Sequence, residues 1–284
     1  MTGIAALVNP NAPTARNIQV FYNTNSFNLG LELKSGDISD QSGNHAFSAA
    51  DTSQGGFIVK ESSLAAAPYL QTQFVIAVTT PKTAAGTTAK TSDVSIVSPL
   101  YMPLTTVNPA NTSLAFCTDG EQGFIFHLGG DSVEKPDIYE YNVNSRTSRD
   151  IPVDGVAKGT ALCAYYEGNL RLCIFENRHG YLMEYDGNQS SPAIDGSAAA
   201  INGTPLGLSY NAEEKKVALY FADKNRALNR MLKMNGAWRD VHQVQNTEPI
   251  AAGSQLTVVR VGNVNHIFYI TGSQGEIYQA RDQV

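Results

Sequence analysis

One short pattern recurs along the chain and constrains the fold more than any other feature. It is a serine or threonine, any residue, then leucine or isoleucine, usually with small residues after it. The six copies are TGIAAL at 2, SSLAAA at 62, TSLAFC at 112, TALCAY at 160, TPLGLS at 204 and SQLTVV at 254. A second apolar segment of strand length follows each copy, and a third follows most of them. The chain therefore predicts six consecutive units of antiparallel strands.

Six units of about 50 residues, each with three or four strands, are typical of a six-bladed β-propeller. The small residues of each first strand suit innermost strands, which converge on the axis. Residues 224–234 look helical in isolation, but their place in the repeat and the turn that follows favour a strand. We expect an all-β, six-bladed β-propeller that forms one domain over residues 1–284. The last unit ends after its third strand, and the sequence leaves open how the ring closes.

Composition argues against several classes of function. Of the 284 residues, 42% are hydrophobic and 16% are charged, and the formal net charge is −6. Lysines and arginines are scattered singly, so the concentrated positive field that nucleic-acid binding needs is missing. No run approaches the roughly 18–20 apolar residues of a membrane span. We find no zinc, calcium, phosphate-loop or nucleophile-elbow motif, and we expect no metal and no cofactor.

Cysteines and glycosylation sequons give only weak information about the compartment. Cys163 and Cys173 fall on consecutive predicted strands, so a cross-strand disulfide is an alternative to the two buried free thiols that we expect. The first residues show no signal-peptide pattern. Three sequons, at Asn111, Asn188 and Asn202, are compatible with a secretory protein. Location and oligomeric state are left open.

The stretch NLRLCIFENRHGYLMEYDGN, residues 169–188, carries two charges in a hydrophobic ribbon. Arg171 lies in the second strand of its unit and Glu184 in the third. Ion pairs across adjacent strands are ordinary structural features, so we expect the two charged groups to lie within salt-bridge reach. The position of the glutamate reads Glu32, Glu140, Arg230 and Gln279 in other units. The arginine and the glutamate therefore do not recur as a pair.

This stretch resembles the repeat of the fungal fucose-specific lectins, a family of six-bladed propellers. Residues 216–240 are similar to the ending of that repeat, with Gly-x-Trp after the third strand. In the family, the arginine and the glutamate bind the sugar and a neighbouring aromatic ring stacks on its apolar face. The resemblance implies Arg171, Glu184 and Trp238 as ligands of a fucosylated glycan. Because the pair does not repeat, we expect one site at most.

In its architecture and in its loss of lectin motifs, the chain also resembles a group of fungal cofactor-free hetero-Diels–Alderases. These enzymes join a tropolone-derived quinone methide to a humulene-type terpene. The resemblance implies an apolar terpenoid and a polyketide-derived tropolone as substrates, held in a central pocket. Residues near the ends of the innermost strands differ between units, and we expect four of them to be catalytic. They are Tyr69, Tyr166, Tyr210 and Arg260.

A site at the opposite mouth of the propeller would instead use Arg178 and His179 in the loop ENRHG, as ligand-binding residues. We rank the cofactor-free cyclase first, the fucose lectin with one or few surviving sites second, and a protein-binding scaffold third. Shared architecture carries much of this ranking, which makes it an argument by analogy.

Overall fold

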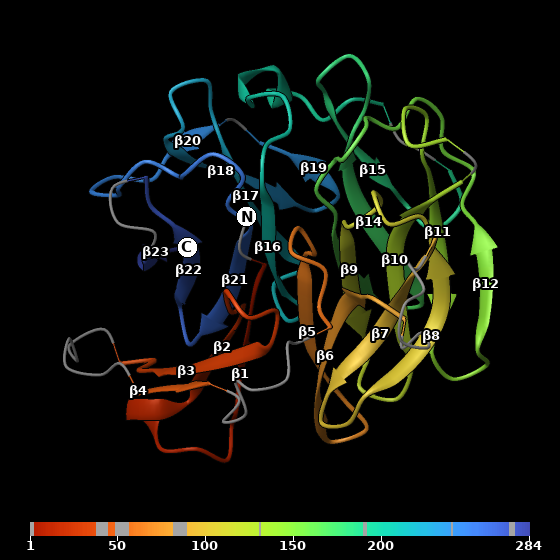
Figure 1. The fold of residues 1–284 in the computed structure, drawn as a ribbon. Helices are drawn as coiled ribbons and strands as arrows, with labels where there is room; N and C mark the ends of the chain where they lie inside the picture. Colours follow the sequence, from red (N-terminus) through yellow and green to blue (C-terminus); the bar gives the residue numbers. More distant parts are fainter. Residues whose placement is uncertain are drawn as a thin grey trace.

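The computed structural model describes residues 3–37, 45–48, 57–81, 90–130, 132–189, 192–239, 241–272 and 276–284. The strands form six antiparallel sheets arranged in turn around a common axis (Figure 1). The colours of Figure 1 follow this ring, so that the first sheet, in red, lies beside the last, in blue. The prediction of an all-β, six-bladed propeller is confirmed, and the extent of a single domain over 1–284 stays a prediction.

The sheets follow the order of the chain. The first holds β1 (Ile4–Val8), β2 (Ile18–Asn23), β3 (Leu29–Lys34) and β4 (His45–Ser48), and the second holds β5 (Leu64–Tyr69), β6 (Thr72–Thr79), β7 (Ser92–Ser98) and β8 (Met102–Val107). The third holds β9 (Leu114–Thr118), β10 (Gly123–Gly129), β11 (Asp137–Asn142) and β12 (Thr147–Asp150), and the fourth holds β13 (Cys163–Glu167), β14 (Leu170–Glu176) and β15 (Leu182–Tyr185). The fifth holds β16 (Leu206–Asn211), β17 (Lys216–Ala222), β18 (Leu228–Met234), β19 (Ala237–Trp238) and β20 (His242–Gln243), and the sixth holds β21 (Leu256–Val261), β22 (Val264–Ile270) and β23 (Ile277–Gln283). Two short 3-10 helices, η1 (Thr14–Arg16) and η2 (Ser197–Ala199), lie in connections.

The first strand of each sheet lies innermost, and these six strands contact one another in a closed ring. Their starts agree with the recurring sequence pattern to within a few residues. Small residues are needed because the strands converge. A Cβ on Gly207 of β16 would lie 2.2 Å from Leu256 Cδ2 of β21, closer than carbon atoms can approach. The segment with helical appearance forms strand β18, as its place in the repeat predicted.

The recurring serine or threonine has a structural role. In four sheets its buried hydroxyl accepts a hydrogen bond from a backbone N–H near the end of the second strand. These bonds join Val78 to Ser62 at 2.7 Å, Glu176 to Thr160 at 2.8 Å, Ala222 to Thr204 at 2.9 Å and Ile270 to Ser254 at 2.8 Å. The motif therefore fixes the entry of each innermost strand against the strand beside it, which satisfies a buried donor.

The ring closes through side chains of the sixth sheet rather than through a shared sheet. Gln255, just before β21, accepts hydrogen bonds through Oε1 from the N–H groups of Ile4 at 2.8 Å and Leu64 at 2.9 Å. Its Nε2 donates to the carbonyl of Leu64 at 2.7 Å. Thr257 accepts a further bond from the N–H of Ala6 at 3.1 Å. One amide side chain thus joins the sixth sheet to the first and second.

The cysteines are free, as expected, and strand geometry explains why. Cys163 lies opposite Ile174, whereas Cys173 lies opposite Ala164. Since side chains alternate between the faces of a strand, the two thiols point to opposite faces of the fourth sheet. Cys117, Cys163 and Cys173 are all buried, and burial raises the pKa of each thiol.

The three sequons differ in accessibility. Asn111 is buried and its Nδ2 donates to the carbonyl of Gly129 at 3.2 Å, whereas Asn188 and Asn202 are exposed. The buried amide is part of the packing of the third sheet. Among the described residues, no helix has the length and apolarity to cross a membrane.

Candidate binding site between the sheets

Arg171 and Glu184 belong to one sheet but lie on its opposite faces. Glu184 pairs with Ile174 across β14 and β15 and therefore shares the face of Ile174. Arg171 is three residues from Ile174, and alternation along the strand directs it to the other face. The expected ion pair between Arg171 and Glu184 is therefore wrong. The spacing of Arg171 and Glu184 in the sequence could not show which face of the sheet each side chain occupies, because that depends on how the two strands are paired.

Arg171 points into the space between the third and fourth sheets, which we call the 3/4 gap. Its Nε and Nη2 donate to Oε2 and Oε1 of Glu140 on β11, at 3.1 and 3.2 Å. Arg149 on β12 binds the same carboxylate, at 2.8 and 3.2 Å. Glu140 is 4% exposed, whereas the side chains of Arg171 and Arg149 are 25% and 48% exposed. The two guanidinium groups therefore hold a buried anion and also reach the surface.

Aromatic rings line the same gap. The guanidinium of Arg171 lies 4.6 Å from the centroid of the Phe124 ring, a cation–π arrangement. Phe124 in turn stacks on the half-buried Tyr166, with centroids 6.0 Å apart. Burial, together with the nearby Asp119, raises the pKa of the Tyr166 hydroxyl, which is therefore protonated at neutral pH. The 3/4 gap thus combines two arginines, a carboxylate and a partly accessible aromatic ring.

Glu184 points the other way, into the space between the fourth and fifth sheets, the 4/5 gap. Lys233 Nζ lies 3.0 and 2.9 Å from its two oxygens, Tyr165 Oη donates to Oε1 at 2.6 Å, and Trp238 Nε1 donates to Oε2 at 3.3 Å. The side chains of Lys233 and Glu184 are only 12% and 6% exposed. The structure thus brings Glu184 and Trp238 together, as the resemblance implied. Their cationic partner is a lysine of the fifth sheet rather than Arg171.

The four residues expected to line one central pocket lie apart. Tyr69 is buried and packs against Phe74 and Phe116 in the second and third sheets. Tyr210 contacts Tyr165 in the 4/5 gap, with centroids 5.3 Å apart. Tyr166 lies in the 3/4 gap, and Arg260 Nε donates locally to the carbonyl of Gly262 at 2.9 Å.

A cavity of about 170 Å³ does lie on the axis, and small and apolar residues of the innermost strands line it. None of the four expected residues is among those that line it. The structure therefore does not bring them together at this cavity, and their catalytic role stays a prediction.

Arg178 and His179 lie in the exposed loop between β14 and β15. The backbone N–H of Arg178 donates to the carbonyl of Gly155 at 2.7 Å, and that of His179 donates to Asn177 Oδ1 at 3.0 Å. Because β14 begins at Leu170 and ends at Glu176, this loop lies at the opposite end of the sheet from Arg171. Their role in ligand binding stays a prediction.

Sequence reasoning did not identify the partners of the charged residues, although one signal was available. Glu140, Glu184 and Arg230 share one position in the third strand of their sheets, opposite the middle of the second strand. In the fifth sheet Arg230 uses that position to bind Asp282 of the sixth, at 2.7 Å. In three successive sheets, the side chain at this position is charged and forms an ion pair with a residue of the following sheet. In the described part of the chain, no three side chains of metal-ligating type come together.

The comparisons with known proteins agree with this architecture. No family model and no curated protein matches the chain. Solved structures do. A fungal lectin from Aleuria aurantia, described as a six-bladed β-propeller with a fucose recognition mode, has a TM-score of 0.70 and 14% identity, over 99% of this chain and 90% of that one. AofleA from Arthrobotrys oligospora has a TM-score of 0.66 and 12% identity, over 99% and 83% of the chains. The lectin SapL1, solved with α-methyl fucoside, has a TM-score of 0.63 and 12% identity, over 100% and 95%. At such identities the likeness establishes the fold, and this chain has the six-bladed β-propeller fold of the fungal fucose-binding lectins.

Proposed function

We propose that this protein is a carbohydrate-binding propeller that recognises a fucose-type sugar at the 3/4 gap. The observation that carries the proposal is the pair of partly exposed arginines, Arg171 and Arg149, anchored on the buried carboxylate of Glu140. The structural neighbours include lectins solved with fucosides. That fact concerns those proteins, and it makes a sugar the first ligand to test here.

The chemistry of the 3/4 gap suits a sugar. A guanidinium has five N–H donors in a fixed plane, and Glu140 occupies only part of this set on each arginine. The remaining donors can bind hydroxyl and ring oxygens. The carboxylate holds both cations in place before a ligand arrives, which lowers the entropy lost on binding. The half-buried ring of Tyr166 offers a flat apolar surface for the C–H face of a pyranose.

The 4/5 gap suits a ligand less well. The ammonium of Lys233, the hydroxyl of Tyr165 and the indole N–H of Trp238 all donate hydrogen bonds to Glu184, and Lys233 also donates to the Tyr165 hydroxyl. A sugar would have to displace these bonds inside a nearly closed space. We therefore assign Glu184 and Trp238 a structural role in the first instance. The proposed site therefore keeps Arg171 from the residues expected from the sequence, whereas Glu184 and Trp238 lie one gap away.

The cofactor-free cyclase is the weaker alternative. Pockets for drug-sized molecules usually measure about 300–1,000 Å³, whereas the axial cavity measures about 170 Å³. Two apolar substrates would need more room than this. Under the cyclase hypothesis, alanine at Tyr210 or Arg260 should lower product formation at least about tenfold. Product formation from a tropolone precursor and a humulene-type terpene would measure this effect, and turnover equal to the parent would remove the alternative.

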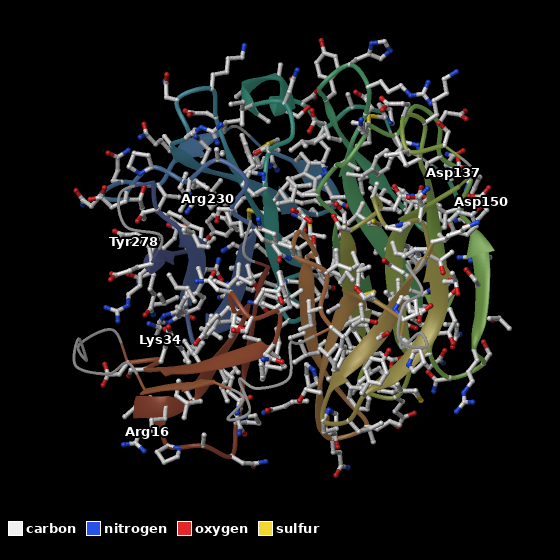
Figure 2. All side chains as sticks on the ribbon, viewed as in Figure 1. Arg16, Lys34, Asp137, Asp150, Arg230 and Tyr278 are labelled. Carbon is white, nitrogen blue, oxygen red and sulfur yellow. The ribbon has the colours of Figure 1, made fainter. Side chains whose placement is uncertain are left out.

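Calorimetric titration with methyl α-L-fucoside tests the proposal. The parent protein should bind one fucoside per chain. Arg171→Gln should raise the dissociation constant at least about tenfold, which corresponds to about 1.4 kcal/mol. Arg16→Gln is the matched control, because Arg16 is an exposed arginine of the first sheet region, far from the 3/4 gap in Figure 2. The control should bind like the parent.

Three results would contradict the proposal. They are no binding of any fucoside by the parent, equal binding by Arg171→Gln, and loss of binding in Arg16→Gln. If Trp238→Phe, but not Arg171→Gln, weakened binding, the site would belong to the 4/5 gap. Melting temperatures of all variants, measured in parallel, separate loss of the site from loss of the fold.

A further inference from the structure

A hollow separate from the 3/4 gap lies between the first and second sheets, the 1/2 gap. These two sheets are neighbours in the ring (Figure 1). The volume of the hollow is about 450 Å³, within the range of about 300–1,000 Å³ typical of small-molecule sites. Its lining includes the carboxamide side chains of Asn9, Asn11, Gln19, Gln71 and Gln73. Among the described residues that line it, none is charged.

The base of the hollow is apolar. Phe21 and Leu31 lie opposite each other in the first sheet, and both line the hollow. Phe21 is 6% exposed and packs in one cluster with Val75 and Ala77 of the second sheet, so this face of the first sheet is turned to the 1/2 gap. Gln19 is two residues from Phe21 on β2 and shares the face. The first sheet therefore offers the hollow apolar carbon with an amide beside it.

Gln73 approaches the hollow from the second sheet. It is two residues from Val75 on β6, so it faces the first sheet. Gln73 is the second residue of its strand and lies opposite Pro68 of β5. Arg171 is likewise the second residue of β14, opposite Tyr166 of β13. The 1/2 gap thus has a neutral amide at the backbone position where the 3/4 gap has a guanidinium, and the two gaps should bind different chemical groups.

Gln71 lines the hollow from an unusual turn. Leu70 and Gln71 form the turn between β5 and β6, and their φ angles are 49° and 59°. This left-handed conformation is unfavourable for most L-residues, and two-residue turns of this kind usually contain Asn-Gly. The N–H of Leu70 donates to the carbonyl of Gly120 at 2.8 Å, which holds the turn in place. Strained backbone gathers at functional sites, and here it presents an amide to the hollow.

The amides that line the hollow have unused hydrogen-bonding capacity. With the described residues, these five side chains form one hydrogen bond, which Asn9 Oδ1 accepts from the N–H of Asn11 at 3.0 Å. A carboxamide has two N–H donors and a carbonyl acceptor. Asn11 and Gln71 are exposed and Gln73 is half-buried, so a ligand can reach them. A neutral ligand with its own donor and acceptor suits these groups, whereas a charged one would lose hydration without gaining a counter-ion.

We infer that the hollow of the 1/2 gap binds a neutral acetamido sugar, a ligand of the N-acetylhexosamine class. The acetamido N–H donates to a carboxamide oxygen of the protein, and the acetamido oxygen accepts from a carboxamide N–H of Gln71 or Gln73. The apolar face of the sugar lies against Phe21 and Leu31. The ligand thus matches the hollow in its neutral charge, its paired donor and acceptor and its apolar face. This inference goes beyond the fucose site proposed for the 3/4 gap and does not depend on it.

Titration of the parent protein with methyl N-acetyl-β-D-glucosaminide, followed by NMR of the ¹⁵N-labelled glutamine side chains, tests the inference. The amide signals of Gln71 and Gln73 should shift on binding, whereas that of Gln243, an exposed glutamine of β20 in the fifth sheet, should not. Methyl β-D-glucoside lacks the acetamido group, and methyl β-D-glucosaminide carries an ammonium instead. Each should bind at least about tenfold more weakly. No shift at Gln71 and Gln73, or equal affinity for either comparison sugar, would overturn the inference.

Two variants locate the contacts. Gln73→Met keeps the length of the side chain and removes the carboxamide, so the dissociation constant should rise at least about tenfold. Gln243→Met is the matched control and should bind like the parent. Gln71→Gly removes a second amide and places glycine in the left-handed turn, so binding should weaken while the melting temperature is kept or raised. Parent affinity in both Gln73→Met and Gln71→Gly would overturn the inference, and Gln71→Gly decides the question if Gln73→Met does not fold.

The two proposed sites can fail separately. Arg171→Gln should leave binding of the acetamido sugar unchanged, and Gln73→Met should leave fucoside binding unchanged. Binding of the acetamido sugar that is lost in Arg171→Gln but kept in Gln73→Met would place this sugar in the 3/4 gap and overturn the inference.

Discussion

Glu140 and Glu184 occupy the same position in adjacent sheets, yet the surroundings of their carboxylates differ. Each lies in a third strand, opposite the middle of the second, and faces the next sheet. Glu140 is held by two arginines that extend to the surface. Glu184 is held by a lysine, a phenol and an indole that remain largely inside. The difference shows that one backbone position can support a cluster whose cations reach the surface or a cluster that is closed to solvent.

The largest effect should follow from removing the anion of the closed cluster. Glu184→Gln leaves Lys233 with little access to water, and breaking a buried ion pair destabilises a protein by about 3–5 kcal/mol. Because the side chain of Lys233 is 12% exposed, we expect a loss near the lower end, about 3 kcal/mol in the free energy of unfolding. Urea denaturation would measure it.

Glu140→Gln serves as the comparison for this loss. Both arginines of the 3/4 gap reach solvent, so their charges remain hydrated and the loss should be about 1 kcal/mol. Equal losses in Glu184→Gln and Glu140→Gln would remove the distinction between the two clusters.

The gap between the sixth and first sheets extends the comparison, because it contains a buried neutral histidine. His266 is fully buried, and its Nδ1 accepts a hydrogen bond from Gln279 Nε2 at 2.8 Å. Burial, helped by Arg281, lowers the pKa of His266 from 6.5 to about 4. Between these values the unfolded chain binds a proton that the folded protein does not. Stability is therefore full above pH 6.5 and falls as the pH drops toward 4.

The size of this pH effect follows from the shift. One pKa unit corresponds to about 1.4 kcal/mol, so the loss should reach about 3 kcal/mol near pH 4. His266→Gln lacks the ionisation, and its unfolding free energy should vary less by that amount between pH 6.5 and 4. Parallel urea titrations of the two proteins at several pH values would show it. If the unfolding free energies of the two proteins changed equally with pH, His266 would have the same pKa in the folded and unfolded states.

A smaller effect should come from the hydroxyls that begin the innermost strands. Thr204→Val leaves the buried N–H of Ala222 without its acceptor, a loss of about 1–2 kcal/mol. Thr112 occupies the same motif position in the third unit, but its hydroxyl makes no hydrogen bond with the described residues. Thr112→Val should therefore change the unfolding free energy by less than about 0.5 kcal/mol. Thermal and urea unfolding would compare the pair, and equal losses would mean that the motif acts alike in both sheets.

The fold could be predicted from the sequence because its signal is repeated. Six copies of one pattern are hard to obtain by chance, and the same pattern explains both the small innermost strands and the buried hydroxyls that hold them. Even the misleading helical appearance of β18 was corrected by its place in the repeat. Repetition also placed Glu140, Glu184 and Arg230 at one common position.

The candidate site could be predicted only in part, because it depends on which face of its sheet each side chain occupies and on residues supplied by the neighbouring sheets. Sequence spacing put Arg171 and Glu184 on adjacent strands but could not tell that they face opposite ways. Their true partners, Glu140 and Lys233, are far away in sequence and become neighbours only when the sheets pack. The same holds for Gln255, whose bonds to Ile4 and Leu64 close the ring.

The smallest and most diagnostic effect concerns the two arginines of the 3/4 gap. Arg171→Gln leaves Glu140 bound to Arg149, and Arg149→Gln leaves it bound to Arg171. Each variant should therefore lose less than about 1 kcal/mol of unfolding free energy, as partly exposed pairs do.

The double variant leaves without a cationic partner a carboxylate that is 4% exposed, so its loss should exceed the sum of the single losses by about 1–2 kcal/mol. A double-mutant cycle by urea denaturation measures that excess. Losses that simply add would mean that neither arginine compensates for the absence of the other at Glu140. If instead the single variants unfold like the parent while Arg171→Gln no longer binds methyl α-L-fucoside, stability and recognition are separated in the Glu140 cluster.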